Sequence, residues 1–260
     1  MSRTTQICLI VVATLFCWVG SARAGVIVLD TFETNEGHFT SAPNASGTSV
    51  GFTTASTAST ADRVTNTPAN TGIGSQRIFI DDDPAVDSTS ATIGGEWTLR
   101  HLSGGGTATN NVDTGSTGMI GYWYKTTTAN LQGAMIIDEA SSGTSNERAV
   151  FKPMIADGEW HALEWSLDST VANSEWANFS GGNGLPNTAY ASIDSLLFRL
   201  TTQDGAPGGD FNGEFWIDDV SYSTVPGESI VPEPASLGLL LMASSAALLR
   251  RRRLPRIQRT

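Results

Sequence analysis

The sequence predicts an all-β protein, an antiparallel β-sandwich of the jelly-roll kind, with an N-terminal signal peptide and a C-terminal transmembrane helix. Apolar residues recur at a period of two in several segments: Leu163 and Trp165 fall on one face of a strand, as do Leu196 and Phe198. Glycine-rich stretches such as 104–106 and 181–184 separate these segments as turns do. Between residues 25 and 224 no stretch has the period of an amphipathic helix. Many short strands joined by such turns are typical of sandwiches.

The 260 residues divide into four segments. Residues 1–24 are predicted to be a signal peptide and 25–224 a β-sandwich domain. Residues 225–231 are predicted to be a linker, and 232–260 form a C-terminal segment of distinct composition. About two hundred residues are enough for a single sandwich with a sizeable core. We therefore expect one folded domain.

The first 24 residues have the three parts of a secretory signal. Arg3 supplies the positive charge, residues 7–19 form the apolar run, and Ala22 and Ala24 make a small-x-small cleavage site. We expect signal peptidase to cut before Gly25.

Both cysteines, Cys8 and Cys17, lie in this leader. Cys17 leaves a lipoprotein interpretation open, but Phe16 is bulky for the position before a lipidated cysteine. A chain that begins at Gly25 has no cysteine left, which excludes disulfides, thiolate chemistry and cysteine metal sites.

The predicted strands follow the leader in order. Residues 26–33 are β-branched and then polar, which favours a first strand. Residues 40–75 are rich in Thr, Ser, Ala, Asn and Gly, and we expect short edge strands and long loops there rather than a disordered linker. From residue 76 onward the alternation is clearer, and strands are predicted at 76–80, 96–103, 118–126, 132–138, 147–152, 159–167, 190–202 and 213–223.

The predicted sandwich is strongly acidic. The whole chain has a formal net charge of -11, but seven of its 15 basic residues and 24 of its 26 acidic residues lie between residues 25 and 224. The sandwich therefore carries a charge of about −17, which disfavours nucleic acid and anionic lipid as ligands. Divalent cations and neutral sugars remain open.

The C-terminal segment has three parts in a fixed order. Two prolines on either side of one residue hold the backbone extended, and the apolar run 235–249 that follows can form a transmembrane helix. At 15 residues this run is shorter than the roughly 20 that a bilayer needs. A basic cluster then keeps its end cytoplasmic. The residues of the motif and of the cluster are Pro232, Glu233, Pro234, Arg250, Arg251, Arg252 and Arg253.

This arrangement resembles the PEP-CTERM sorting signal, which exosortase reads in Gram-negative bacteria that export polysaccharide. The resemblance covers about a tenth of the chain, and the additional residues 254–260 depart from the usual tail. It implies that the helix holds the chain in the membrane until exosortase cuts near Pro-Glu-Pro. The mature protein would then reach the cell surface or the extracellular matrix. The alternative is an ordinary C-terminal membrane anchor.

Three short stretches of the predicted sandwich also resemble known families. The segment DTFE at 30–33 is similar to the opening strand of jelly-roll carbohydrate-binding modules, and FWIDDVS at 215–221 is similar to their closing strand. The segment DGEWHAL at 157–163 resembles a strand of laminin-G and concanavalin-like sandwiches. Such patterns are shared widely among extracellular β-sandwiches, so they support the fold more than any ligand.

A structural Ca²⁺ that joins the first and last strands is implied by the same resemblance. The candidate ligands are Glu33 and Asp218, with Asp219 as the alternate. Alternation also places Asp218 beside Trp216 and Val220, where a carboxylate needs a partner. The alternative is that Asp219 is solvated, Asp218 lies at a strand bulge, and no ion binds.

The tryptophans are the remaining candidates for ligand contact. Those in predicted strands are expected to fill the core for the most part: Trp97, Trp123, Trp160, Trp165 and Trp216. Trp176, beside a Gly-Gly-Asn-Gly loop, is the candidate sugar contact, because an exposed indole can stack on a sugar ring. The alternative for Trp176 is an apolar latch that pins this loop.

These observations predict an exported, non-catalytic protein of the cell surface or extracellular matrix that binds polysaccharide and not nucleic acid. Its processing partners would be signal peptidase and exosortase. The alternative function is a secreted glycan hydrolase on a concanavalin-like sandwich. Against it, the three histidines, His38, His101 and His161, are scattered, and no glycanase signature is present.

Overall fold

The structure is a computed structural model that describes residues 25–52, 58–65, 69–83, 97–168, 175–200 and 212–231. The predicted leader, with Ala22 and Ala24, lies outside these residues. So do the predicted helix 235–249 and the sorting residues Pro232, Glu233, Pro234, Arg250, Arg251, Arg252 and Arg253. Signal cleavage and sorting therefore stay predictions.

The chain divides into two compact units, Met1–Ile230 and Val231–Thr260. Val231 is the only residue of the second unit that the structure describes. Within the described residues, no helix has the length and apolar character that a membrane crossing requires.

The first sheet, sheet A, has six antiparallel strands in the part of the chain that the structure describes. The last strand is the longest, and it pairs with β3 through residues 213–217 and with β1 through residues 220–223. The last strand of the described chain thus pairs with strands that lie near its beginning. The order is β2 (Thr60–Val64), β3 (Ser75–Ile80), β12 (Gly213–Ser223), β5 (Met119–Thr126) and β9 (Trp160–Ser166), with β1 (Val26–Asp30) on β12.

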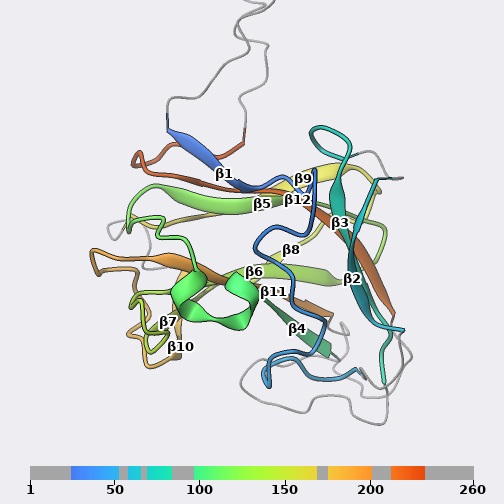
Figure 1. Cartoon of the computed structure of the whole chain (residues 1–260), viewed down its shortest axis with the longest axis horizontal. Helices are drawn as coiled ribbons and strands as arrows, with labels where there is room; N and C mark the ends of the chain where they lie inside the picture. Colours follow the sequence, from blue (N-terminus) through green and yellow to red (C-terminus); the bar gives the residue numbers. More distant parts are fainter. Residues whose placement is uncertain are drawn as a thin grey trace, which may run out of the picture. The chain divides into compact units, whose positions relative to one another are not determined.

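The second sheet, sheet B, also has six antiparallel strands among the described residues. Its order is β10 (Trp176–Ser180), β7 (Asn146–Ala149), β6 (Leu131–Asp138), β11 (Ser192–Leu200) and β4 (Trp97–Leu102), with β8 (Lys152–Pro153) on β6. Two short 3₁₀ turns, η1 (Gly104–Gly106) and η2 (Ala108–Asn110), follow β4. Figure 1 shows the two sheets as stacked layers, with β2 and β3 along one side.

Aromatic side chains between the sheets form the centre of the core. The Phe198 ring of sheet B lies 4.4 Å from the Phe215 ring and 5.7 Å from the Tyr122 ring, both of sheet A. The Tyr122 ring lies 5.9 Å from that of Trp165. Such ring pairs stabilise a core beyond the area that they bury. They also identify the inward side of each strand, and hence its outward side.

The all-β part of the predicted fold class is confirmed: the described chain forms two antiparallel sheets consistent with a β-sandwich. The strands predicted from residue 76 onward are present within one or two residues, except that 147–152 divides into β7 and β8. The first strand ends at Asp30 because Phe32 has a φ of 51°, which no strand allows. The prediction missed β10, and it placed short edge strands correctly at β2.

Candidate functional site

The outward side of sheet A carries three tryptophans on neighbouring strands. Tyr122 and Trp165 point inward, as their ring contacts show, and adjacent strand residues point to opposite faces. Trp123 of β5 and Trp160 of β9 therefore point outward. Trp216 of β12 does so as well, because it follows the inward-facing Phe215. All three are partly exposed. We call this outward side, with Trp123, Trp160 and Trp216, the tryptophan face.

The strand register fixes the spacing of these rings. Lys125 pairs with Trp160 on one side and with Trp216 on the other, so these two tryptophans lie two strands apart in one row. Two strand spacings are about 9.5 Å, comparable to the length of two linked sugar rings. Trp123 lies in the next row, opposite Ala162. The indole N–H of Trp216 has no hydrogen-bond partner among the described residues.

The expectation that the strand tryptophans fill the core is only partly right. Trp97 and Trp165 are fully buried, whereas Trp123, Trp160 and Trp216 are not. Trp123 lies between Tyr122 and Tyr124, so three large rings in succession hide which of them face the core. The sequence of β12 does contain a usable pattern. Phe215 and Ile217 flank Trp216, and this alternation indicates that Trp216 points to the opposite side of the strand.

Trp176 is buried rather than exposed. Its side chain is 5% exposed, and its indole N–H donates to the carbonyl of Ser166 at 2.6 Å. The ring belongs to the core because β10 pairs with β7 and brings Trp176 opposite Ala149. A buried indole offers no plane to a sugar, so the prediction that Trp176 contacts a sugar is wrong. Its burial agrees with the alternative, an apolar latch.

The three candidate calcium ligands meet at one loop. Asp218 Oδ2 accepts from the backbone N–H groups of Asn70 (2.9 Å) and Thr71 (3.2 Å), and Asp219 Oδ2 accepts from the Asn70 side chain at 2.8 Å. Glu33 Oε1 accepts from the backbone N–H groups of residues 73 and 74 at 2.9 and 3.0 Å. The carboxylates thus hold residues 70–74 between the segment that follows β1 and the middle of β12.

This junction is electrostatically and conformationally strained. Burial, and secondly the neighbouring Asp219, raise the pKa of Asp218 to about 7. Burial also raises the pKa of Asp219, and the Glu33 carboxylate adds to that increase. Phe32 and Asp219 have φ values of 51° and 45°, a region that costs about 1–3 kcal/mol for such residues. A bound cation would relieve the charge repulsion.

Whether calcium binds at this junction stays a prediction. Carboxylate oxygens are ligands that Ca²⁺ prefers. Within the described residues, however, no three His, Cys, Asp or Glu side chains form a group that could hold a metal ion. The alternative is right in one respect, because the register shifts between Asp218 and Ser221 as at a bulge, but Asp219 is only 6% exposed and not solvated.

The outward side of sheet B carries three arginines, and we call it the arginine face. Arg100 of β4 and Leu197 of β11 are register partners, and Arg199 lies two residues further along β11. Leu197 is also the partner of Ala134 on β6, and Arg148 of β7 is the partner of Ile136 on that strand. Because Phe198 points toward sheet A, these residues lie on the other side of sheet B, where Leu197, Ala134 and Ile136 are buried and the three arginines are partly exposed.

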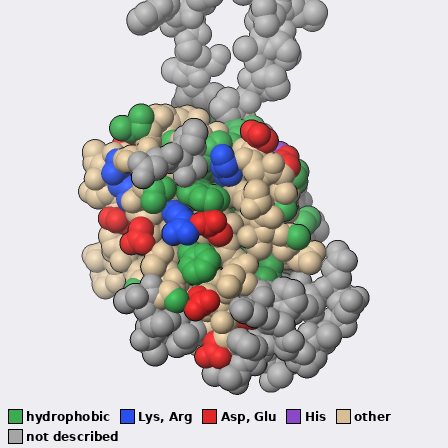
Figure 2. All heavy atoms as spheres, turned by 90° about the vertical axis from the view of Figure 1, so that its right-hand side faces the viewer, with side chains coloured by type: hydrophobic (Ala, Val, Ile, Leu, Met, Phe, Trp, Pro, Cys, Tyr) green, Lys and Arg blue, Asp and Glu red, His purple; other side chains and the backbone are tan. Residues whose placement is uncertain are grey.

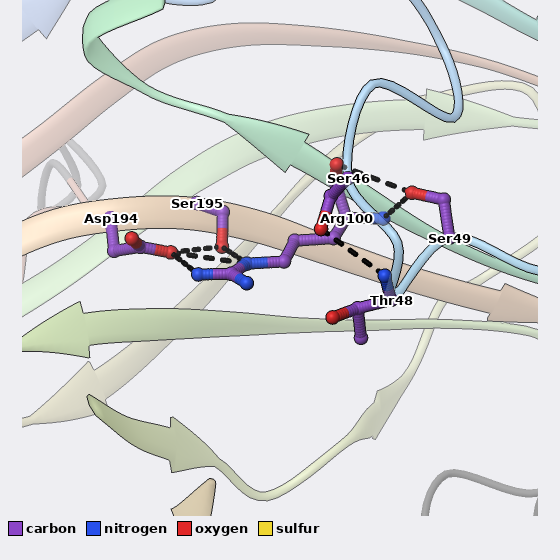
Figure 3. A network of polar contacts seen from close by, with 6 residues as sticks. All are labelled: Ser46, Thr48, Ser49, Arg100, Asp194 and Ser195. Carbon is purple, nitrogen blue, oxygen red and sulfur yellow. Dashed lines mark hydrogen bonds and ion pairs between the residues drawn. The ribbon is translucent and has the colours of Figure 1, made fainter. Parts of the chain in front are cut away.

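Arg100 is tied down by a polar network, shown in Figure 3. Its Nη2 donates to Asp194 Oδ2 at 2.6 Å, and its Nε donates to Ser195 Oγ at 3.1 Å. Its backbone N–H donates to Ser49 Oγ at 2.9 Å, which connects β4 to the segment between β1 and β2. The guanidinium also lies 5.2 Å from the centre of the Phe179 ring. Its charge is therefore matched within the fold.

Figure 2 views the molecule from the side of β2 and β3, where hydrophobic side chains are interspersed with both basic and acidic ones. Arg77 of β3 illustrates this pattern. It donates from Nε to Glu214 Oε1 at 2.6 Å and lies 5.6 Å from the Phe79 ring centre. The Arg77 charge is thus paired within sheet A.

The histidines do not form a catalytic group. His38 contacts Asp30 at 3.1 Å, and His161 contacts Asp157 at 2.9 Å. His101 is fully buried against Gln76, and burial lowers its pKa to about 4. Each has a separate local partner, which is the arrangement of structural histidines.

No protein-family model and no curated protein sequence matches the chain. The similar solved structures are carbohydrate-binding modules with a β-sandwich fold. The family 11 module of the cellulosomal cellulase Lic26A-Cel5E of Clostridium thermocellum is 14% identical, with a TM-score of 0.41, and the match covers 80% of this chain and 99% of that one.

Two further structures show the same level of similarity. The CBM22-1–GH10 modules of xylanase Xyn10B of Clostridium thermocellum, complexed with xylohexaose, are 14% identical, with a TM-score of 0.37, and 78% and 29% of the two chains are covered. The module CBM6cm-2 of Cellvibrio mixtus lichenase 5A, in complex with cellotriose, is 12% identical, with a TM-score of 0.27 and coverages of 74% and 98%. Similarities this distant do not assign a ligand to the chain.

Proposed function

We propose that this chain is an exported, non-catalytic protein of the cell surface or extracellular matrix that binds polysaccharide. The observation that carries the proposal is the tryptophan face, on which Trp123, Trp160 and Trp216 project from three adjacent strands. Large partly exposed indoles on a rigid sheet are costly to leave in water, and they fit the apolar faces of sugar rings.

A polysaccharide matches this face better than a small ligand does. Trp160 and Trp216 are fixed two strands apart in one row, so a chain of linked sugars can contact both rings at once. Each stacking contact contributes modestly, on the order of 1 kcal/mol, and a repeating ligand adds them. The strands also hold the rings in place before binding, which lowers the entropic cost.

Export is proposed from the two ends of the chain. The leader with Ala22 and Ala24 supplies a signal-peptidase site, and the Pro-Glu-Pro motif, apolar run and arginines supply a sorting signal of the exosortase type. Mass spectrometry of the protein from native cells tests this proposal. Mature termini at Gly25 and near Pro232 would support it, and an intact Met1 and Thr260 would contradict it.

Affinity electrophoresis of the purified chain in gels that contain neutral β-glucan or xylan tests binding. We expect retardation by at least one of the two, and Trp216→Ala should weaken it about fivefold, the equivalent of one stacking contact of about 1 kcal/mol. Trp97→Phe, a change inside the core, is the matched control and should retain binding. Equal retardation of the wild type and a Trp123→Ala/Trp160→Ala/Trp216→Ala variant would reject the tryptophan face.

The same samples distinguish the binding protein from a glycan hydrolase. A reducing-sugar assay on each polymer should show no release above the blank. Release that a single carboxylate substitution abolishes would favour the enzyme instead.

A further inference from the structure

We propose that the arginine face is a second binding surface, which takes the carboxylate groups of an acidic polysaccharide. It lies on the opposite sheet from the tryptophan face and does not depend on that face binding a neutral sugar. Basic residues are scarce in the predicted sandwich. Only seven Lys and Arg residues occur between residues 25 and 224, and three of them, Arg100, Arg148 and Arg199, lie on this one face.

Two of these arginines share one aromatic ring. The Arg199 guanidinium carbon lies 3.8 Å from the centre of the Phe151 ring, and that of Arg148 lies 5.2 Å from it. Arg199 Nε also donates to Gln132 Oε1 at 2.7 Å, which orients its fork on the sheet. The ring and the amide thus hold two cationic groups close together.

Arg148 lacks a counter-charge within the described residues. No ion pair involves it there, and its Nε is buried with no hydrogen-bond partner. An anion is the partner that a guanidinium binds most strongly, and the burial of Nε leaves the two terminal nitrogens of Arg148 to bind it. Partial burial, and secondly the charge of Arg148, lower the pKa of Arg199. An anion between the two would remove that repulsion.

Arg100 shows what a satisfied arginine looks like on the same face. It lies beside the Phe179 ring as Arg148 lies beside Phe151, but Asp194 neutralises it at 2.6 Å. Arg148 differs from Arg100 in that no carboxylate of the described chain forms an ion pair with it. The ligand that completes Arg148 is therefore a carboxylate from outside the fold, bound through two parallel N–H groups of the planar fork.

Among anionic ligands, an acidic sugar fits this face better than a nucleic acid or a peptide does. Nucleic acid binding needs many cations, because duplex DNA presents about one charge per 1.7 Å, and the strongly acidic sandwich would repel it. Phe151 and Phe179, both partly exposed, flank the arginines and offer apolar planes to pyranose rings. Uronic-acid polymers combine these two features, a planar carboxylate and an apolar ring face.

Isothermal titration of the purified full-length chain with polygalacturonate tests the proposal. The matched probe is fully methyl-esterified polygalacturonate, which has the same backbone without the charges. We expect binding of the free acid only, and Arg148→Gln should weaken it at least tenfold. Arg148→Lys should weaken it less, because it keeps the charge and loses the fork. Arg77→Gln, which removes a ring-stacked arginine from the other sheet, should not change it.

The outcomes separate this inference from the proposed function. Equal binding of the esterified polymer, an unchanged affinity in Arg148→Gln, or equally tight binding of polyglutamate would overturn it. Binding of neutral glucan by the tryptophan face is measured separately and can fail while this surface binds. Should Arg148→Gln not fold, competition by free galacturonate on the wild type decides, and no displacement of the polymer would count against the surface.

Discussion

The two outward sides of this sandwich use aromatic rings in opposite ways. On the tryptophan face the partly exposed indoles lie beside an ion pair between Arg77 and Glu214. On the arginine face the phenyl rings lie beneath guanidiniums, and Arg148 has no carboxylate partner in the described part of the chain. One surface thus offers apolar planes and the other offers charge.

The difference teaches that the net charge of a domain does not describe its surfaces. The chain carries -11 overall, which by itself argues against any anionic ligand. Three of the seven Lys and Arg residues between positions 25 and 224 nevertheless lie on the arginine face, so positive charge is concentrated there. Four predictions test this difference between the two faces. They also test how much residues of the interior contribute to stability.

The largest effect is expected from comparing the two sides of strand β9. Trp165→Ala removes a fully buried ring and should lower the free energy of unfolding by about 3–5 kcal/mol. Trp160→Ala, on the outward side of the same strand, should cost about 1 kcal/mol or less. Urea denaturation measures both. Equal losses would show that Trp160 is a core residue and would remove it from the tryptophan face.

A smaller effect should separate Arg100 from Arg148 on the arginine face. Arg100→Gln leaves the nearly buried carboxylate of Asp194 without its partner, and we expect a loss of about 2 kcal/mol in unfolding free energy. Arg148→Gln should be close to neutral because it breaks no ion pair. If the two variants destabilise the protein equally, then Arg148 has a structural role, and the carboxylate-binding surface loses its main support.

The pH dependence of stability should come partly from Asp218 of strand β12. Asp218 has a pKa of about 7 in the folded protein, above its value of 3.8 when unfolded. The folded state therefore binds more protons between these values, so this group's contribution to stability is complete below pH 4 and is lost as the pH rises through 7. Melting temperatures between pH 5 and 8 should fall, and Asp218→Asn should flatten that slope. A parallel slope in the variant would contradict the assignment.

The smallest expected effect concerns calcium. If Glu33, Asp218 and Asp219 hold Ca²⁺, EDTA should lower the melting temperature at pH 7.5 by a few degrees, on the order of 1 kcal/mol. Asp218→Ala should abolish the difference between the two conditions. Melting curves that coincide with and without EDTA in the wild type would discard the ion.

Much of the fold was predictable because its signals are local. The strands at 118–126, 132–138 and 213–223 were recognisable from alternation and from the glycine-rich turns between them. The first strand was predicted too long, because the left-handed φ of Phe32 depends on the junction with residues 69–74 rather than on its neighbours in sequence. Strand β10 was missed because its five residues form a strand only when β7 pairs with them.

The candidate sites were less predictable, since each combines residues from distant strands. Glu33, Asp218 and Asp219 were chosen together from a resemblance, and the structure does bring them to one loop. The indole of Trp176 was expected in solvent and lies in the core, because the pairing of β10 turned it inward. The arginine face had no signal in the sequence, where its members are separated by about fifty residues each.

Composition and local pattern are enough to indicate most of the strands, the acidity and lack of cysteine of the predicted domain, and what the two ends of the chain resemble. These properties depend on composition and on neighbours a few residues apart. Only the tertiary structure decided which of the aromatic residues Tyr122, Trp123 and Tyr124 face water. It also decided that Arg148 and Arg199 meet at Phe151. The reason is physical: alternation assigns residues to two sides of a strand, but the side that is buried, and the strands that become neighbours, are set by pairing across the whole chain.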